Sequence, residues 1–210
     1  MLEGVFYADW SPDAKNLAVV RVVDGRFRLE YPIGKVLYEA PGWITYPRLS
    51  PKGDRIAFLD HPTLGEDDGS VSVVDLSGHK TNLSSGWKNL KGLAWSPRGD
   101  EVWFSGDRMT RSQLVYAVTL SGHERLVLQA PGWMRLQEIS RDGRVLMLQA
   151  SPRSRVMCQP PDASMERDLS WLDWSTVADL SADGKKLLFY EWGEGVAGNP
   201  TVYLRNTNGG

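Results

Sequence analysis

The chain has few of the residues that most often carry redox or metal chemistry, with one cysteine and three histidines among 210 residues. A single cysteine, Cys158, excludes an internal disulfide and permits a reducing compartment. It follows Val156 and Met157 in a predicted strand, so we interpret it as a small buried side chain rather than a reactive thiol. We expect no cofactor.

The chain also lacks a long apolar run and an excess of charge of either sign. No stretch approaches the ~18 consecutive apolar residues of a membrane span, and the N-terminus has no signal-peptide pattern. Lys and Arg number 24 against 26 Asp and Glu, a net charge of −2, which leaves no basic stripe for phosphates. We therefore expect a soluble protein that has no nucleic-acid partner and does not insert into a membrane. Its compartment stays open: cytoplasmic, or extracytoplasmic within a membrane-anchored parent.

What the chain does have is a turn signature that occurs five times. In each copy a hydrophobic residue and a serine precede a polar turn and an apolar strand, at 10–15, 49–54, 95–100, 139–144 and 180–185. The serines are 39, 46, 44 and 41 residues apart, at Ser11, Ser50, Ser96, Ser140 and Ser181. A period near forty with strand-like content indicates a β-propeller with one repeat per blade.

Each repeat divides into apolar runs separated by Gly, Pro, Asp and Asn, which predicts four short antiparallel strands per blade. We predict an all-β chain that forms one β-propeller domain over 1–210. Its five blades are expected at approximately 4–40, 41–84, 85–130, 131–169 and 170–210. The last blade has no sequence for an outer strand, so we favour a fragment of a longer propeller. Imperfect closure, or completion by another subunit, are the alternatives.

The turn signature has a conformational reason. Proline sets the first corner, and glycine takes the left-handed position that closes the hairpin. Glycine holds that position in four copies, whereas Ala14 replaces it in the first. Because a left-handed alanine costs on the order of 1–2 kcal/mol, we expect the first turn to have a different shape.

The motif resembles the WD40-like (PD40) repeat of bacterial TolB-type propellers. The stretches that carry the resemblance are 50–58, 73–78, 95–104 and 116–122. The stretches 7–12, 27–38 and 167–175 look like the propeller attached to some bacterial eukaryotic-type Ser/Thr protein kinases. This resemblance implies a sensory or protein-docking module beside a catalytic domain. Similar propellers also cap prolyl-oligopeptidase-type peptidases.

The sequence offers no nucleophile with a base and an orienting acid. It has no Gly-x-Ser-x-Gly elbow, His79 and His123 take the same turn position in adjacent repeats, and His61 lies in a loop. We expect no catalytic residues and predict a non-catalytic binding or scaffold module for a protein or peptide, with carbohydrate as another ligand class. Self-association through unpaired blade edges is a further expectation. The alternative is the accessory propeller of a peptidase, or a propeller hydrolase that acts at the central channel.

Four of the nine tryptophans each open the first strand of a repeat: Trp43, Trp87, Trp133 and Trp171. Because the four share one position in the repeat, we expect them on one face of the propeller. There they could form an aromatic ring at the mouth of the central channel that binds a sugar or a peptide. Alternatively, each seals the loop between neighbouring blades. Trp10 and Trp95 lie within strands and are expected in the core.

Charged residues also recur at one position of the repeat, two residues before the motif serine: Asp9, Arg48, Glu138 and Asp179. They could line a polar channel or pair one blade with the next. The loop 61–69 holds Glu66, Asp67 and Asp68, whose carboxylates make it a weak Ca²⁺ candidate because the spaced ligands of an EF-hand are missing. We predict no other metal site.

Overall fold

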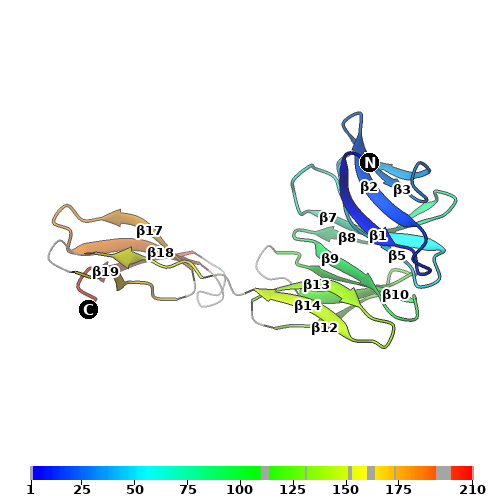
Figure 1. Cartoon of the computed structure of the whole chain (residues 1–210). Helices are drawn as coiled ribbons and strands as arrows, with labels where there is room; N and C mark the ends of the chain where they lie inside the picture. The colour runs from blue at the N-terminus through cyan, green and yellow to red at the C-terminus, as the bar shows by residue number, and fades with distance from the viewer. Residues whose placement is uncertain are drawn as a thin grey trace. The chain divides into compact units, whose positions relative to one another are not determined.

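The structure is a computed structural model that describes residues 2–109, 114–130, 132–150, 153–159, 164–172, 174–192 and 200–209. The regular structure of these residues is entirely β-strand (Figure 1). They fall into two compact units, Met1–Ala150 and Ser151–Gly210, which we call the N-terminal and C-terminal units and describe separately. Among the described residues, no helix has the length and apolar character needed to cross a membrane.

The N-terminal unit contains three four-stranded antiparallel sheets and one two-stranded sheet, each with its strands in chain order. The first sheet consists of β1 (Val5–Trp10), β2 (Leu17–Val23), β3 (Arg26–Glu30) and β4 (Val36–Ala40). The second consists of β5 (Trp43–Leu49), β6 (Arg55–His61), β7 (Gly69–Asp75) and β8 (Lys80–Trp87). The third consists of β9 (Lys91–Trp95), β10 (Glu101–Gly106), β11 (Leu114–Thr119) and β12 (Glu124–Leu128). The fourth pairs β13 (Trp133–Ile139) with β14 (Val145–Ala150). The predicted all-β fold with four-stranded blades is confirmed.

The C-terminal unit holds a two-stranded and a three-stranded sheet. Their strands are β15 (Met157–Cys158), β16 (Arg167–Asp168), β17 (Trp174–Leu180), β18 (Lys186–Trp192) and β19 (Thr201–Asn206). Strands β17 to β19 are the three that the sequence supplies for the fifth repeat. The fourth repeat is the exception to the pattern, because its strands form two separate pairs, β13 with β14 and β15 with β16. The assignment of both units to one domain stays a prediction.

The core of the N-terminal unit lies between successive sheets. One cluster joins the first and second sheets around Leu29, Ile44 and Phe58, and another joins the second and third around Trp87 and Phe104. Strand β6 is buried on both faces, since Ile56 to Leu59 are all inaccessible to solvent. Face-to-face sheets explain why the second strand of a repeat reads as a continuous apolar run.

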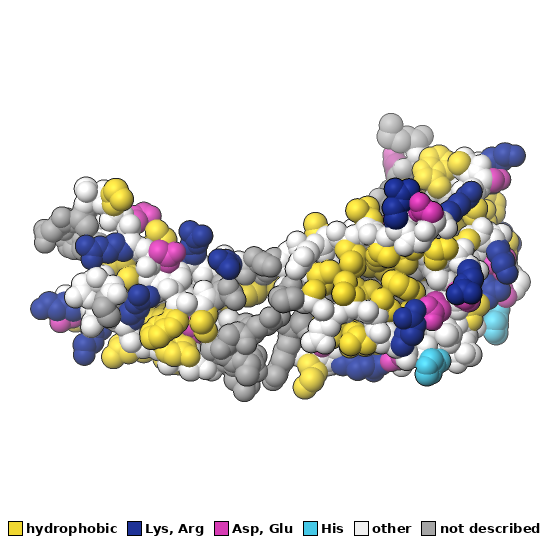
Figure 2. All heavy atoms as spheres, turned by 90° about the horizontal axis from the view of Figure 1, so that it is seen from below, with side chains coloured by type: hydrophobic (Ala, Val, Ile, Leu, Met, Phe, Trp, Pro, Cys, Tyr) yellow, Lys and Arg dark blue, Asp and Glu magenta, His cyan; other side chains and the backbone are white. Residues whose placement is uncertain are grey.

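Apolar side chains also reach the surface of this unit. Figure 2 shows them gathered in a patch on the face seen from below, among charged side chains of both signs. Leu146 and Leu148 of β14 are exposed, and among the described strands β14 pairs only with β13. Self-association through blade edges stays a prediction.

The turn after the first strand has one shape in the first three repeats. The N–H of Ala14 donates to the Ser11 carbonyl at 2.8 Å, as that of Gly53 does to the Ser50 carbonyl at 2.8 Å. Ala14 has φ 55°, close to the 70° of Gly53. The expectation of a different first turn was therefore wrong: the hydrogen bonds of the turn hold alanine in the left-handed region.

Candidate functional site

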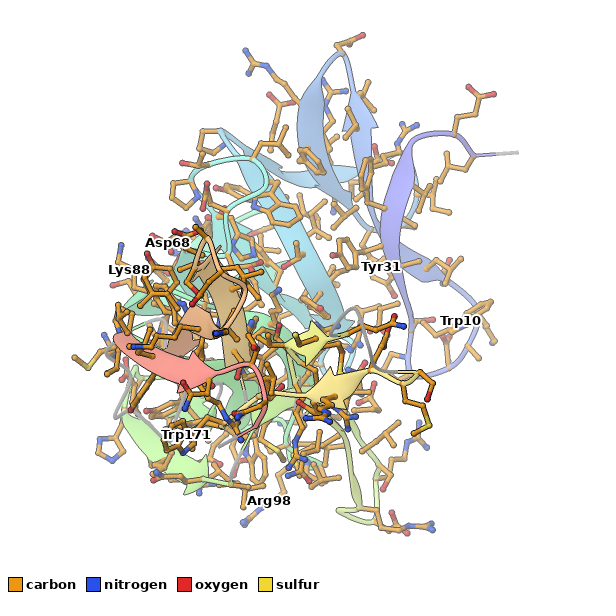
Figure 3. The ribbon with its side chains drawn as sticks, turned by 90° about the vertical axis from the view of Figure 1, so that its left-hand side faces the viewer. Trp10, Tyr31, Asp68, Lys88, Arg98 and Trp171 are labelled. Atoms are coloured by element: carbon orange, nitrogen blue, oxygen red, sulfur yellow. The ribbon has the colours of Figure 1, made fainter. Side chains whose placement is uncertain are left out.

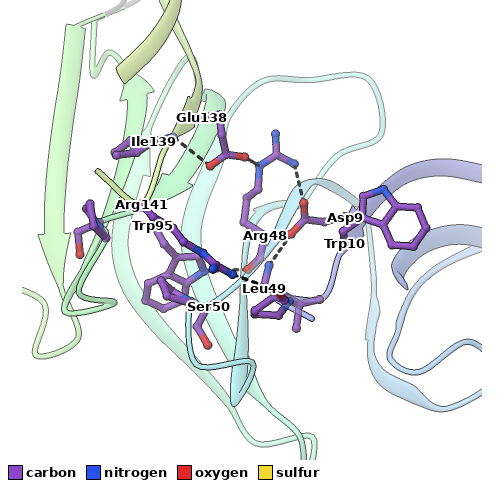
Figure 4. Close-up of a pocket in the computed structure, with 13 residues that line it drawn as sticks. Asp9, Trp10, Arg48, Leu49, Ser50, Trp95, Glu138, Ile139 and Arg141 are labelled. Atoms are coloured by element: carbon purple, nitrogen blue, oxygen red, sulfur yellow. Dashed lines mark hydrogen bonds and ion pairs between the residues drawn. The ribbon is translucent and has the colours of Figure 1, made fainter. Parts of the chain in front are cut away.

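Four first strands of the N-terminal unit end at one hollow. Strand β1 packs beside β5, β5 beside β9, and β9 beside β13. At their C-terminal ends they surround a space of about 620 Å³, which includes the solvent at its mouth (Figure 4). The residues that line it are Asp9, Trp10, Pro12, Arg48, Leu49, Ser50, Pro51, Trp95, Ser96, Pro97, Glu138, Ile139 and Arg141. We call this site the inner-strand hollow.

The wall of the hollow is made by the repeated turn itself. Its prolines Pro12, Pro51 and Pro97 come from three successive repeats. A Cβ on Gly99 would lie 3.3 Å from Pro51 Cδ, and one on Gly53 would lie 3.6 Å from Pro12 Cδ. The prolines of the first two turns therefore pack on the glycines of the next turns, which brings these three turns close together at the hollow, whereas a Cβ on Gly143 would meet nothing within 4 Å.

β-Bulges precede two of the charged residues at the hollow. The register of β5 against β6 shifts between Thr45 and Arg48, and that of β13 against β14 shifts between Leu136 and Glu138. A bulge bends its strand and changes the direction of the side chains that follow. In β5 it includes Tyr46 at φ 50°, a left-handed conformation that is rare for a large side chain. Arg48 and Glu138 both follow such a bulge and line the hollow.

Arg48 joins carboxylates from two other sheets. Its Nη1 lies 4.0 Å from Asp9 Oδ1, and its Nε lies 3.5 Å from Glu138 Oε2. The Asp9 side chain also accepts the backbone N–H of Leu49 through Oδ2 at 2.7 Å. The sequence placed these three charges at one repeat position, and the structure brings them together as pairs between blades. Asp179, the fourth member, belongs to the C-terminal unit.

The Arg48 guanidinium makes two hydrogen bonds within the protein. Nη1 donates to the Pro47 carbonyl at 3.1 Å and Nη2 to the Gln137 carbonyl at 3.2 Å. Nε is buried and has its Glu138 ion pair but no hydrogen bond. The Arg48 carbonyl accepts the indole N–H of Trp95 at 2.8 Å. Arg48 is thus a fixed internal cation.

Burial raises the pKa of the Asp9 carboxyl above its ordinary value. The Leu49 N–H and the Arg48 guanidinium act in the opposite direction, while the Glu138 carboxylate raises the pKa further. A carboxyl group with a perturbed pKa in a concave site is a typical mark of a functional site.

Two lining residues were not recognised in the sequence. Arg141 stands where the first three repeats have proline, and its Nη2 donates to the Pro12 carbonyl of the first repeat at 3.0 Å. Trp10 was expected in the core but is 62% exposed, whereas Trp95 is buried as expected. Trp10 ends β1, beyond the apolar cluster that joins the first two sheets. The replacement of proline by arginine was the only sequence signal for Arg141.

The four predicted ring tryptophans differ in environment. Trp87 is 1% exposed and packs between the second and third sheets against Phe104 and Tyr116, which is the sealing role. Trp43 is half-buried, lies over the His61 ring and donates its indole N–H to the Glu66 carbonyl at 3.0 Å. Trp43 begins β5, which reaches the hollow only at Arg48. Trp87 ends β8, the fourth strand of the second sheet, so the expectation that it opens a first strand was wrong.

The other two tryptophans are exposed, Trp133 by 41% and Trp171 by 57%. Trp171 belongs to the C-terminal unit, where its ring lies 5.4 Å from Tyr203 and beneath the Arg205 guanidinium. It lines a second, shallow space with Ser170, Leu204 and Arg205. The aromatic ring of four stays a prediction.

The acidic loop contacts lysines. Lys88 Nζ lies 2.8 Å from Asp68 Oδ2 (Figure 3), and Lys91 Nζ lies 2.9 Å from Asp67 Oδ2. Across the part of the chain that the structure describes, no group of three or more His, Cys, Asp or Glu side chains is placed to hold a metal ion. The loop joins β6 to β7 of the second sheet, and its ion pairs with Lys88 and Lys91 attach it to the start of the third repeat.

His61 anchors that loop from inside. It is fully buried, and its Nδ1 lies 3.0 Å from the Asp68 carbonyl while its Nε2 lies 2.9 Å from Thr45 Oγ1. Because a carbonyl can only accept, Nδ1 carries the proton and Nε2 accepts from the hydroxyl. Burial lowers the pKa of the imidazole below its ordinary 6.5. The sequence suggested only a loop residue here.

Comparison with known proteins identifies the fold. No sequence-family model and no curated protein matches the chain. A putative TolB from Agrobacterium tumefaciens matches with 20% identity and a TM-score of 0.53, over 98% of this chain and 78% of that one. A Mycobacterium tuberculosis puromycin-hydrolyzing peptidase matches with 19% identity and a TM-score of 0.54, over 97% and 37%. A prolyl endopeptidase matches with 17% identity and a TM-score of 0.54, over 89% and 32%.

The chain thus has an all-β propeller fold, and the four sheets of its N-terminal unit make a partial propeller. Within that class, its structural neighbours are TolB-like propellers and the propeller domains of prolyl endopeptidases. The chain spans 51% of the TolB of Acinetobacter baumannii and 32% of the prolyl endopeptidase.

Proposed function

We propose that the chain is a non-catalytic binding module that holds a protein or peptide partner at the inner-strand hollow. One observation carries this proposal: four repeats each contribute the end of a first strand to the same hollow, whose charges are fixed across sheets. A concave site with an apolar wall and a few fixed polar groups is the usual form of a ligand site.

The polar groups of the hollow are suited to binding. The hydroxyls of Ser50 and Ser96 donate to Asp54 at 2.6 Å and to Asp100 at 2.7 Å within their own turns. The lining residues include no histidine that could activate either serine. Turnover of any ester, lactone or peptide by the purified chain would contradict the non-catalytic assignment.

For the parent protein, we propose a larger bacterial signalling protein such as a Ser/Thr kinase, in which the propeller is a sensory or protein-interaction region. The sequence stretches that resemble kinase-attached propellers support this choice. The structural likeness to two peptidases favours a second candidate, the accessory propeller of a prolyl-oligopeptidase-type peptidase. Mass spectrometry of the polypeptide that carries this sequence in cells distinguishes them, because only one kind of catalytic domain can accompany it.

Selection of peptides from a random display library tests the binding function. Pro97→Arg places a long side chain at the hollow, and Arg141 shows that this turn accepts arginine at the same position. The matched control is Ser121→Arg, in the exposed turn between β11 and β12. We expect peptides that bind the unmodified chain and the control but not Pro97→Arg. Failure to select any peptide, or equal binding to Pro97→Arg, would contradict the proposal.

A further inference from the structure

We infer that the inner-strand hollow receives a cationic side chain of the lysine or arginine type from its peptide partner. This inference rests on the proposed function and adds the chemical class of the ligand. It follows from a comparison of two groups of polar atoms at the hollow: those that already have hydrogen bonds within the protein, and the oxygens that can still accept a hydrogen bond from a ligand.

The carboxylates keep an oxygen for a ligand. Asp9 uses Oδ2 for the Leu49 N–H, while Oδ1 has only the 4.0 Å contact with Arg48. Glu138 uses Oε1 for the Ile139 N–H at 2.9 Å, its Oε2 has only the 3.5 Å ion pair with Arg48 Nε, and its side chain is 52% exposed. A carboxylate oxygen accepts charge-assisted hydrogen bonds from ammonium and guanidinium groups.

Arg48 does not offer the complementary site for an anion. Both of its Nη atoms donate to backbone carbonyls, and its Nε is buried. Two carboxylates therefore face one guanidinium, both of whose Nη atoms already donate within the protein. Asp9, Arg48 and Glu138 together carry one net negative charge, and Arg141, the fourth charged residue at the hollow, offsets it as long as it stays there.

The wall fits the stem of such a side chain. Pro12, Pro51 and Pro97 give an apolar surface beside the carboxylates, with Leu49 and Ile139. Lysine and arginine bury their alkyl stems against apolar surface while the charged head stays with polar partners.

The chain itself places one such side chain over the hollow. Arg141 reaches from the fourth repeat toward the first and is held there by its hydrogen bond to the Pro12 carbonyl (Figure 4). Arg141 is exposed, and a single hydrogen bond to a neutral carbonyl holds it at the hollow, so a ligand cation can displace it. Arg141 thus competes with the ligand for the hollow.

Calorimetric titration with capped amino-acid amides tests the inference. The probes are N-acetyl-lysine amide, its uncharged counterpart N-acetyl-norleucine amide, and the anionic N-acetyl-glutamate amide. We expect the lysine probe to bind at least about tenfold more tightly than norleucine, since hydrogen bonds to charged groups contribute about 1.5–3 kcal/mol. Glu138→Gln and Asp9→Asn should each weaken lysine binding about tenfold. Arg141→Ala should strengthen it.

Glu39→Gln is the control, because Glu39 pairs with Arg26 and Arg28 on β3, outside the hollow. The exposed Glu138 keeps the test decisive if Asp9→Asn fails to fold. Equal binding of lysine and norleucine, preference for glutamate that Arg141→Ala abolishes, or an equal effect of Glu39→Gln would overturn the inference. Library peptides that need the hollow but lack lysine and arginine would overturn it while leaving the proposed function intact.

Discussion

At the scale of single residues, side chains of one type have different roles in this chain. Trp87 lies in the interface of two sheets, where Arg108 also stacks on its ring, while Trp10 ends a strand at the surface. Arg48 is an internal cation, whereas Arg141 is exposed at the same hollow and donates to the carbonyl of Pro12. Burial and committed hydrogen bonds, rather than residue type, decide which side chain stabilises and which can bind.

Replacing these two tryptophans by alanine should therefore change the free energy of unfolding by different amounts. Trp87→Ala should lower the free energy of unfolding by about 3–5 kcal/mol, because it leaves a large cavity between two sheets. Trp10→Ala should change it by less than about 1 kcal/mol, as for an exposed site. Urea unfolding followed by circular dichroism measures both. Equal losses would contradict the assignment of Trp87 to the core.

His61 predicts a dependence of stability on pH. Its pKa is lowered by burial, so above pH 6.5 the imidazole is neutral in the folded and unfolded chains and contributes nothing. As the pH falls below 6.5, the unfolded chain takes up a proton that the folded chain excludes, and stability declines until the folded-state pKa is reached. His61→Gln should reduce this decline between pH 7 and pH 5 in urea unfolding. His79→Gln, at an exposed turn, should leave it unchanged.

At the scale of the element, the repeated turn combines local and long-range constraints. In the second repeat the Ser50 hydroxyl donates to the Asp54 carboxylate and accepts the Asp54 backbone N–H, and Pro51 packs on the turn of the third repeat. The left-handed residue is therefore required by the hydrogen bonds of the turn whichever residue occupies the position. Ala14 carries the strain that glycine avoids elsewhere.

This strain predicts opposite effects for a matched pair of substitutions. Ala14→Gly should raise the free energy of unfolding by about 0.5–1 kcal/mol, because relief of the left-handed strain exceeds the added freedom of the unfolded chain. Gly53→Ala should lower it by a similar amount, since the added Cβ makes only an ordinary 3.6 Å contact with Pro12. Thermal unfolding of both variants provides the measurement. A loss of stability in Ala14→Gly would show that the turn is not strained.

At the scale of the N-terminal unit, Arg48 connects sheets that are distant in the sequence. It contacts Asp9 of the first sheet and the Gln137 carbonyl and Glu138 of the fourth. Arg48→Met should therefore speed amide hydrogen exchange both near 9–16 and near 137–144, because it leaves the two sheets without their common partner. Arg125→Met removes a pair with Glu101 inside the third sheet and should have only a local effect. If amide exchange in Arg48→Met became faster only within β5, Arg48 would not connect the two sheets.

The repeat spacing was enough to predict the sheets and the meeting of Asp9, Arg48 and Glu138, since equivalent positions of successive blades lie on one face. Spacing could not predict Arg141, whose position reads only as a lost proline. It also could not predict that His61 is buried, because its partners Thr45 and Asp68 come from another strand and the far end of a loop. The bulges that redirect Arg48 and Glu138 have no simple sequence pattern.

The packing of Pro12 on Gly53 and of Pro51 on Gly99 has a consequence for engineering. The module that can be duplicated or exchanged is the seam that joins two repeats, rather than a single repeat. A tandem copy of the second repeat would place Pro51 of one copy against Gly53 of the next and preserve the seam. A graft of the fourth repeat into an earlier position would bring an arginine to a contact shaped for proline, so its partner turn would have to be redesigned with it.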